Sequence, residues 1–376
     1  MSEHHDEPIT IKTIAEVAAF YRNQIPVNIP ADYAVIPALL TVADEHGVRG
    51  GVAAFRDFLY LLCDRLISDG HLYAASPKNP KNIADYPFLH NLTNMLAEIG
   101  YCGAPTDGGS LVVKKMPSCT ASTGANGKTI KPKIGASGQI ECLRFLSLCG
   151  FYFSGVDLEQ KTPKARETLS FTVSYPGDPA VLTGLRVLSF AEMELRTGSR
   201  YWNDNNILRC DYRPIRADEP DALEYLEDFL QPLPERLREF AVRLHRRYIG
   251  MGMTCAMHAR GDVNFAYAYA KNGRTDLSPK DIYTKSVWQF SYSLRHGYCL
   301  VVRAKKTDKY RNIVEGFPAA LRQKIERGYG CDRKLYNERC QHGCQGIRLP
   351  LDESISELGE HIETWLDNEV SYAIKT

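Results

Sequence analysis

Potential metal ligands gather in one stretch near the end of the chain, residues 331–352. It holds three of the eleven cysteines and one histidine: Cys331, Cys340, His342 and Cys344. Structural zinc takes four soft or borderline ligands in a tetrahedron, and a short loop supplies two of them when they are two to four residues apart. Cys340 and Cys344 have this spacing. The stretch therefore indicates a zinc site, which Cys331 and either His342 or a more distant residue would complete.

Two other interpretations of these cysteines stay open. Free cysteines often serve as small buried hydrophobic side chains, and the spacing differs from the paired C-x2-C form of many zinc sites. A redox-sensing thiol is the other alternative, because Arg333, Lys334 and Arg339 would lower a thiol pKa. Two helical patterns flank the stretch, so a bound ion would first of all hold a loop together. We expect a structural role rather than a catalytic one.

Basic residues gather in two further places, a helical pattern at 235–248 and a strand-to-helix junction at 303–311. The candidate phosphate ligands are Arg236, Arg243, Arg247, Lys305, Lys306 and Lys309. If they share a face, they can hold several phosphates of a nucleic acid. Acidic neighbours such as Glu235 and Glu239 favour the simpler interpretation of a solvated helix face.

Local signatures of catalysis are missing from the sequence. It contains no G-x-S-x-G, no H-E-x-x-H and no G-x-G-x-x-G. A site assembled only by the fold leaves no such trace, so a small-molecule enzyme stays an alternative. His258 and Asp262, close to Cys255, form the candidate acid/base pair, although a surface turn also accounts for them.

The charge balance limits the classes of partner. Forty-six Lys and Arg residues and forty-five Asp and Glu residues leave a formal net charge of +1. This balance excludes capture of nucleic acid or anionic membrane by the chain as a whole. Residues 1–10 lack the order of a signal peptide, and the most apolar window, 55–67, is shorter than the ~20 residues of a membrane span. With mostly isolated cysteines, these features predict a cytoplasmic protein with no membrane contact.

Apolar spacing predicts the elements that would position these residues. A capping box at Thr13 and Glu16 predicts a helix that runs to about residue 23. Further helices are expected at 35–45, 52–68, 88–99, 139–148, 180–195, 234–248, 309–327 and 355–370. Strand-like segments are 110–115, 168–175, 263–271, 287–294, 298–305 and 347–349. The predicted fold class is α+β, with several small helix–strand units, a mostly helical N-terminal part and a C-terminal two-layer α/β unit.

Polar segments suggest where the chain divides. Residues 117–137 are rich in Ser, Thr, Gly, Lys and Pro and indicate a flexible loop or linker, and residues 217–228 form an acidic second linker. The remaining stretches are long enough for separate cores. The predicted regions are an N-terminal helical or α+β region at 1–116, a middle α+β unit at 138–216 and a C-terminal α+β domain at 229–376.

Three segments of the C-terminal region carry a resemblance to a known group. They read WQFSYSLRHGYCLVVRAKKTDKY, FPAALRQKIERGYGC and GIRLPLDESISELGEHIETWL. Together they resemble the YdhG/MmcQ-like small α+β domains over about residues 286–370. In that group two strands, a helix and an apolar strand that ends in a Leu-Asp-x-x-Ile-type turn lead into a closing helix. The cysteine-rich stretch is an insertion in this pattern, and the whole chain is similar to an uncharacterised clostridial protein family.

The resemblance implies a fold more than an activity. Members of the group have been linked to iron delivery and to a double-wing DNA-binding fold, so a nucleic-acid-binding regulator stays an alternative. Regular α+β patterning without catalytic signatures favours a non-enzymatic binding or scaffold protein, with zinc as the candidate cofactor and no partner identified.

Overall fold

The chain folds into two compact units. The computed structural model describes residues 12–73, 86–123, 128–159, 170–195, 207–218, 222–259, 262–269, 282, 285–327 and 346–374. The N-terminal unit comprises Met1–Ser199 and Asn205–Glu219, and the C-terminal unit comprises Arg200–Asp204 and Pro220–Thr376. Both units combine helices with antiparallel sheets, which confirms the predicted α+β class.

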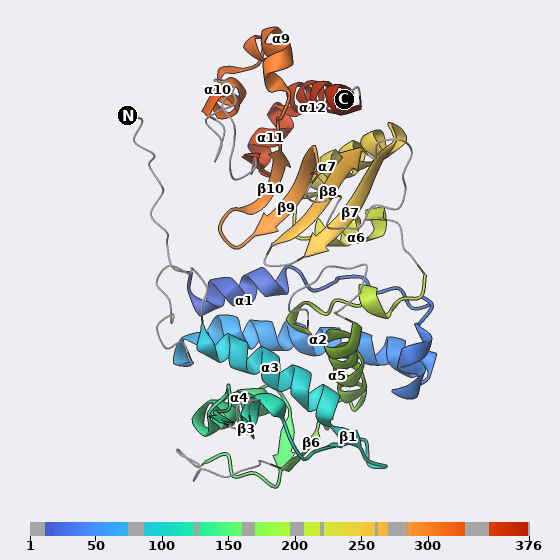
Figure 1. The fold of residues 1–376 in the computed structure, drawn as a ribbon, viewed down its shortest axis with the longest axis vertical. Coiled ribbons are helices and arrows are strands. Elements are labelled where there is room, and N and C mark those ends of the chain that lie inside the picture. The colour runs from blue at the N-terminus through green and yellow to red at the C-terminus, as the bar shows by residue number, and fades with distance from the viewer. Residues whose placement is uncertain are drawn as a thin grey trace. The chain divides into compact units, whose positions relative to one another are not determined.

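Helices make up most of the N-terminal unit (Figure 1). They are α1 (Ile14–Arg22), α2 (Glu45–Asp69), α3 (Pro87–Cys102), α4 (Ala136–Leu148) and α5 (Ala180–Phe190). α1 begins at the predicted capping box, in which the Glu16 backbone N–H donates to the Thr13 hydroxyl. α5 packs against α2 and α3. α2 and α5 approach so closely that a β-carbon on Gly184 would overlap the carbonyl oxygen of Gly51.

Short strands and turns complete this unit. One sheet has the order β1-β2-β6-β5, and β3 and β4 form a separate hairpin. The strands are β1 (Ala104–Pro105), β2 (Leu111–Val113), β3 (Ser122–Thr123), β4 (Thr129–Ile130), β5 (Tyr152–Ser154) and β6 (Phe171–Ser174). The turns are short 3-10 helices, η1 (Pro37–Thr41), η2 (Gly70–Leu72), η3 (Pro117–Cys119), η5 (Ile207–Arg209) and η6 (Arg213–Ile215), and one short π-helix, η4 (Ala191–Leu195).

Two parts of this unit differ from the predictions. The expected helix at 35–45 is wrong: only the turn η1 forms there, and Asp44 instead caps the start of the long helix α2 by accepting from the Gly47 N–H at 2.7 Å. The segment 117–137, predicted to be flexible, contains η3 and the β3–β4 hairpin. Ser118 and Ile134 within it are buried, and the Ser118 N–H donates to both carboxylate oxygens of buried Glu98.

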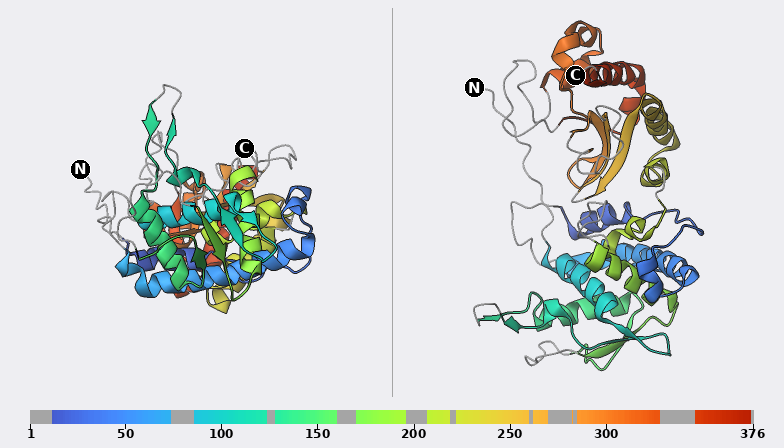
Figure 2. Two further views of the ribbon diagram at one scale, coloured as in Figure 1. Left: turned by 90° about the horizontal axis from the view of Figure 1, so that it is seen from below. Right: turned by 45° about the vertical axis from the view of Figure 1, so that its right-hand side comes forward.

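An antiparallel sheet lies among the helices of the C-terminal unit (Figure 2, right). It has five strands in the order β11-β10-β9-β8-β7. The strands are β7 (Met253–Ala259), β8 (Val263–Tyr269), β9 (Trp288–Ser293), β10 (Gly297–Val302) and β11 (Ile347–Pro350). The helices and the turn η8 are α6 (Ala222–Phe229), α7 (Glu235–Gly250), η8 (Thr307–Tyr310), α9 (Arg311–Glu315), α10 (Ala319–Arg327), α11 (Glu353–Glu357) and α12 (Gly359–Ile374).

Strands β8, β9, β10 and β11 and helix α7 confirm the predictions for those segments. Four other parts differ. The predicted helix at 309–327 is two helices, because Pro318 cannot continue a helix. The closing helix is divided at Leu358, and α6 forms within the predicted acidic linker. Strand β7 was not predicted, since its sequence MTCAMHA has little of the β-branched content typical of strands.

One face of this sheet is an aromatic core, which we call the apolar face. Its residues include Phe265, Tyr267, Trp288, Phe290 and Leu300, all below 1% exposed. The rings of Tyr267 and Trp288 stack with centroids 3.7 Å apart. The ring of Tyr248 on α7 packs against Trp288, and the ring of Phe229 on α6 packs against Phe265. Helices thus cover the apolar face with close ring contacts.

Candidate functional site

The opposite face of the same sheet carries polar side chains in its central strands. His258 on β7 lies directly opposite Asn264 on β8. Asn264 lies opposite Ser291 on β9, and Ser291 lies opposite Cys299 on β10. Directly opposite side chains on one face have β-carbons about 5 Å apart. The four residues therefore form a continuous row across the sheet.

The neighbouring row on this face is mostly small and apolar. Ala256, Ala266, Gln289 and Val301 lie opposite one another on β7, β8, β9 and β10. Ile282, from the connection between β8 and β9, packs against Ala266 and Ala268. We call these two rows, together with Ala268, the polar face. Gln289 is a polar side chain in this row, and Arg348 on β11 continues the row beyond Val301.

The polar face is buried. His258, Asn264 and Gln289 are each 4% exposed, and Ser291 is 6% exposed. An antiparallel sheet with one covered face commonly leaves its other, polar face in water. Because buried polar atoms are costly without hydrogen bonds, each one here needs a partner.

Gln289 has only part of the partners it needs. Its Nε2 donates to Asn264 Oδ1 at 3.2 Å. Its Oε1 is shielded from solvent and accepts no hydrogen bond from the described part of the chain. Several other buried side-chain atoms also lack a partner among the described residues, among them Trp288 Nε1 on the apolar face and Ser189 Oγ, which lies against Gly100 in a close helix contact. Gln289 differs because its neighbours in the adjacent row are polar.

The row does not have the geometry of a catalytic site. His258 and Ser291 are two strands apart, about 10 Å, whereas a base must lie within about 3 Å of a nucleophile. Burial raises the pKa of the Cys299 thiol to about 11, and the thiol donates to the His296 carbonyl at 3.3 Å, so it is not a reactive thiolate at neutral pH. Asp262, the other member of the candidate acid/base pair, is exposed just before β8. Among the described strand residues, no carboxylate lies on the polar face.

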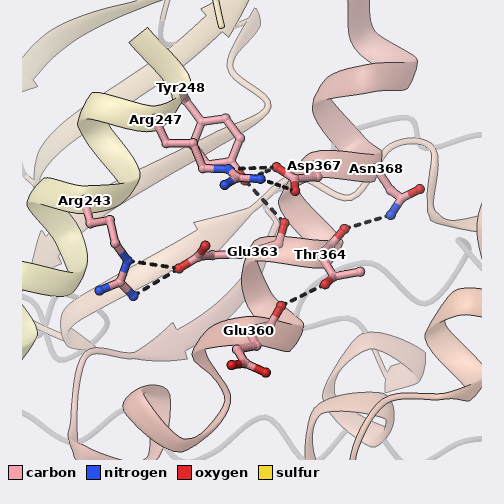
Figure 3. A network of polar contacts seen from close by, with 8 residues as sticks. All are labelled: Arg243, Arg247, Tyr248, Glu360, Glu363, Thr364, Asp367 and Asn368. Atoms are coloured by element: carbon pink, nitrogen blue, oxygen red, sulfur yellow. Dashed lines mark hydrogen bonds and ion pairs between the residues drawn. The ribbon is translucent and has the colours of Figure 1, made fainter. Parts of the chain in front are cut away.

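Two of the candidate phosphate ligands form ion pairs between α7 and α12 (Figure 3). Arg243 donates to Glu363 Oε1 through Nε at 3.2 Å and through Nη2 at 3.0 Å. Arg247 Nη2 lies 2.6 Å from Asp367 Oδ2, and this hydrogen bond raises the pKa of Arg247. Tyr248 also donates to Asp367, at 2.9 Å. Arg243 and Arg247 of α7 thus bind carboxylates of this chain.

The second basic segment is fixed to α12 through a buried carboxylate, Glu369. It accepts from the Lys306 backbone N–H at 3.2 Å, from Thr307 Oγ1 at 2.7 Å and from the Tyr310 hydroxyl at 2.5 Å. Burial and this carboxylate raise the pKa of Tyr310. The side chains of Lys305 and Lys309 are exposed, Lys306 is half-buried, and Arg236 is exposed in the first turn of α7.

The two basic segments contact different sides of α12. Asp367 and Glu369 are two residues apart, and side chains at that spacing do not face the same way on a helix. α7 reaches the side of Asp367, whereas the 305–310 segment reaches the side of Glu369. The contacts therefore do not join the two segments into one basic surface.

The predicted zinc ligands Cys331, Cys340, His342 and Cys344 lie outside the described residues, so the zinc site stays a prediction. Within the described ranges, no group of three or more His, Cys, Asp or Glu side chains can hold a metal ion. The eight cysteines that the structure describes are free thiols.

Comparisons with known proteins give no relative. No protein-family model matches the sequence, and neither the curated proteins nor the solved structures contain a significant match. The resemblance to the YdhG/MmcQ-like group therefore stays a prediction. No helix in the described part of the chain is long and apolar enough to cross a membrane.

Sequence reasoning singled out His258 but missed Asn264, Gln289 and Ser291. The strand sequences VNFAYAY and WQFSYS do alternate between large aromatic and small or polar residues. This alternation is typical of any strand with one solvated face. Only the pairing of β8 with β9, together with the burial, distinguishes a site from an ordinary surface.

Proposed function

We propose that the protein is a non-enzymatic binding protein whose C-terminal unit takes up a small ligand on the polar face of its sheet. The single observation that carries this proposal is the buried Gln289 Oε1, which accepts no hydrogen bond from the described residues. A ligand N–H or O–H at this atom would supply the missing bond. Asn264 and Ser291 in the row beside it carry further donors and acceptors.

Binding fits this geometry better than catalysis. The hydroxyl and thiol of the row lie too far from His258 for activation, and the Cys299 thiol is protonated at neutral pH. A nucleic-acid-binding regulator has less support, because Arg243 and Arg247 already bind Glu363 and Asp367.

Three other proposals rest on the sequence. The ligand set Cys331, Cys340, His342 and Cys344 would bind one structural zinc, and the mostly isolated cysteines favour the cytoplasm of a bacterial cell. Elemental analysis of the purified chain, with Cys340→Ser and Cys344→Ser as controls, tests the zinc site: about one equivalent is expected, lost in both variants. Metal-free protein would contradict it.

Membership of the YdhG/MmcQ-like group is the third of these proposals. It is supported by the order β9, β10, α9, α10, β11 and α12, and by Asp352, which caps α11 in the expected Leu-Asp-x-x-Ile turn.

Ligand-observed NMR with a library of small uncharged molecules tests the binding function. We expect at least one compound to bind the full chain and to bind the Gln289→Met variant at least tenfold more weakly. Gln139→Met is the matched control, since Gln139 is a buried glutamine of the N-terminal unit that donates to the carbonyls of Cys119 and Ile134. Equal binding to the wild-type chain and Gln289→Met, or no binding by any compound, would overturn the proposal.

A further inference from the structure

A basic segment of the N-terminal unit contains no acidic residue. Residues 108–140 include five lysines and no Asp, Glu, Arg, His or aromatic residue, so this segment has a formal charge of +5 although the whole chain has only +1. The lysines are Lys114, Lys115, Lys128, Lys131 and Lys133, and all five are exposed. Positive charge that the chain balances elsewhere is therefore concentrated on one surface segment. We call its residues 114–123 and 128–133 the basic arm.

The outer part of the basic arm is the β3–β4 hairpin, which extends away from the helices of the N-terminal unit (Figure 2). The four strand residues Ser122, Thr123, Thr129 and Ile130 are all exposed. A two-stranded hairpin that packs on nothing is marginally stable in water. The hairpin therefore adds little to the core of its unit, and contact with a partner would stabilise it.

The base of the basic arm, in contrast, is held by buried contacts. The Ser118 N–H donates to the buried carboxylate of Glu98 on α3, and the Ile134 N–H donates to the Ser118 carbonyl at 2.9 Å. Gln139 of α4 donates to the Cys119 carbonyl at 3.4 Å. These bonds hold the two ends of the arm side by side on α3 and α4. An exposed loop on a fixed base is a common design for a binding element.

The charges of the basic arm are not neutralised by the described part of the chain. Lys114, Lys115, Lys131 and Lys133 form no ion pair with any described residue. Helix α4 begins three residues after Lys133, and its start has neither a side-chain cap nor an acidic residue in the first turn. The backbone N–H groups of such a helix start favour an anion such as phosphate. The helix start thus adds to the attraction that the lysines exert.

We propose that the basic arm binds the phosphate backbone of double-stranded DNA, independently of base sequence. The major groove of B-DNA admits a two-stranded β-ribbon. Lysines before and after the hairpin neutralise phosphates along the groove and release their counterions. Thr123 and Thr129 lie directly opposite each other in the ribbon, and their hydroxyls can donate to phosphate oxygens. This surface belongs to the other unit from the proposed ligand site and does not depend on that site.

The composition of the arm favours duplex DNA over other polyanions. Proteins hold single strands by stacking bases on aromatic side chains, and residues 108–140 have none. The deep, narrow major groove of duplex RNA does not admit such a ribbon. Segments that lie on a membrane present several large apolar side chains, whereas Ile130 is the single one exposed on the described arm. Without arginine, the arm also lacks the residue that most often reads base sequence.

Fluorescence anisotropy of a labelled mixed-sequence duplex of about 20 base pairs, titrated with the full chain between about 50 and 200 mM NaCl, tests the proposal. We expect the logarithm of the association constant to fall with the logarithm of salt concentration at a slope of about −4, as for four or five neutralised phosphates. The double variant Lys131→Gln/Lys133→Gln should bind about tenfold more weakly or worse, with a slope less steep by about 2. The matched control, Lys305→Gln/Lys309→Gln, removes two exposed lysines of the C-terminal unit and should bind like the wild-type chain.

Three results would overturn the proposal. The first is no binding of the duplex, and the second is equal weakening by the two double variants, which would mean that the arm is not the contact surface. The third is a different partner: tighter binding of single-stranded DNA of the same length, or binding of phosphatidylglycerol vesicles without binding of the duplex. None of these results affects the proposed ligand site, which Gln289→Met tests separately.

Discussion

The two faces of the C-terminal sheet are made by alternate residues of the same strands, yet they differ in the kind of side chain they bury. On the apolar face, Trp288 and Phe290 contact other rings on several sides, and the polar atom of Trp288, Nε1, is buried without a hydrogen-bond partner among the described residues. On the polar face, Gln289 lies between them in sequence and leaves its buried Oε1 without a partner among the described residues. Sequences tend to break the rules of stability where a site has to function. The apolar face holds the fold, and the polar face is where we place the site.

The largest expected effect comes from the apolar face. Phe290→Ala removes a fully buried ring and leaves a cavity, so the free energy of unfolding should fall by about 3–5 kcal/mol. Urea denaturation of the full chain measures this change. A loss below about 1 kcal/mol would mean that this face is not a packed core.

Glu369 sharpens the comparison, because it is a buried polar group that has its partners. Glu369→Ala leaves the Thr307 and Tyr310 hydroxyls without their acceptor, so we expect a loss of about 2–3 kcal/mol in the same urea assay. Glu369→Gln keeps an acceptor and should lose less. Equal stability of Glu369→Ala and wild type would contradict the idea that buried polar groups here are held by their hydrogen bonds.

The Cys299 thiol of the polar face should make the free energy of unfolding depend on pH, and the expected change is intermediate in size. Its pKa is raised to about 11 by burial, so between pH 9 and 11 the unfolded chain releases this proton while the folded chain keeps it. Stability should therefore fall as pH rises above about 9, by about 1 kcal/mol at pH 10 for this one group. Cys299→Ala should reduce the drop between pH 8 and pH 10 by that amount. An unchanged drop would show that this thiol ionises equally in both states.

The smallest expected effect comes from Gln289 on the polar face. Gln289→Met removes a buried carbonyl that accepts no hydrogen bond from the described residues, but it also removes the Nε2 donor to Asn264 Oδ1, so these effects offset each other and the free energy of unfolding should change by less than about 1 kcal/mol. Gln139→Met, in contrast, removes a donor to two carbonyls and should lose about 1–2 kcal/mol. If Gln289→Met loses as much as Gln139→Met, Gln289 is an ordinary structural residue.

Much of the fold follows from local patterns. The Thr13 capping box, the apolar stripe of α7 and the strands β8, β9 and β10 are encoded by neighbours within a few residues. Local patterns do not predict the secondary structure where a single residue or a tertiary contact determines it. Pro318 divides a helix that its apolar spacing would continue, and β7 forms because β8 pairs with it along its whole length.

The candidate site was less predictable than the fold. Only His258 stood out, since histidine is a common acid/base residue. Asn264 and Gln289 gain their meaning from being neighbours on β8 and β9, about twenty-five residues apart in sequence, and from their burial. In contrast, the sequence marked Arg243 and Arg247 as candidate phosphate ligands. It could not show their carboxylate partners, which lie 120 residues further along the chain.

The most direct test of the binding site is an NMR titration of the full chain labelled with ¹³C at alanine methyl groups. Ala266 reports on the polar face, whereas Ala241 lies buried in α7, which covers the apolar face. We predict that a bound ligand shifts the Ala266 methyl resonance and leaves that of Ala241 unchanged, and that Gln289→Met abolishes the shift. A ligand that shifts Ala241 but not Ala266 would contradict the assignment of the site to the polar face.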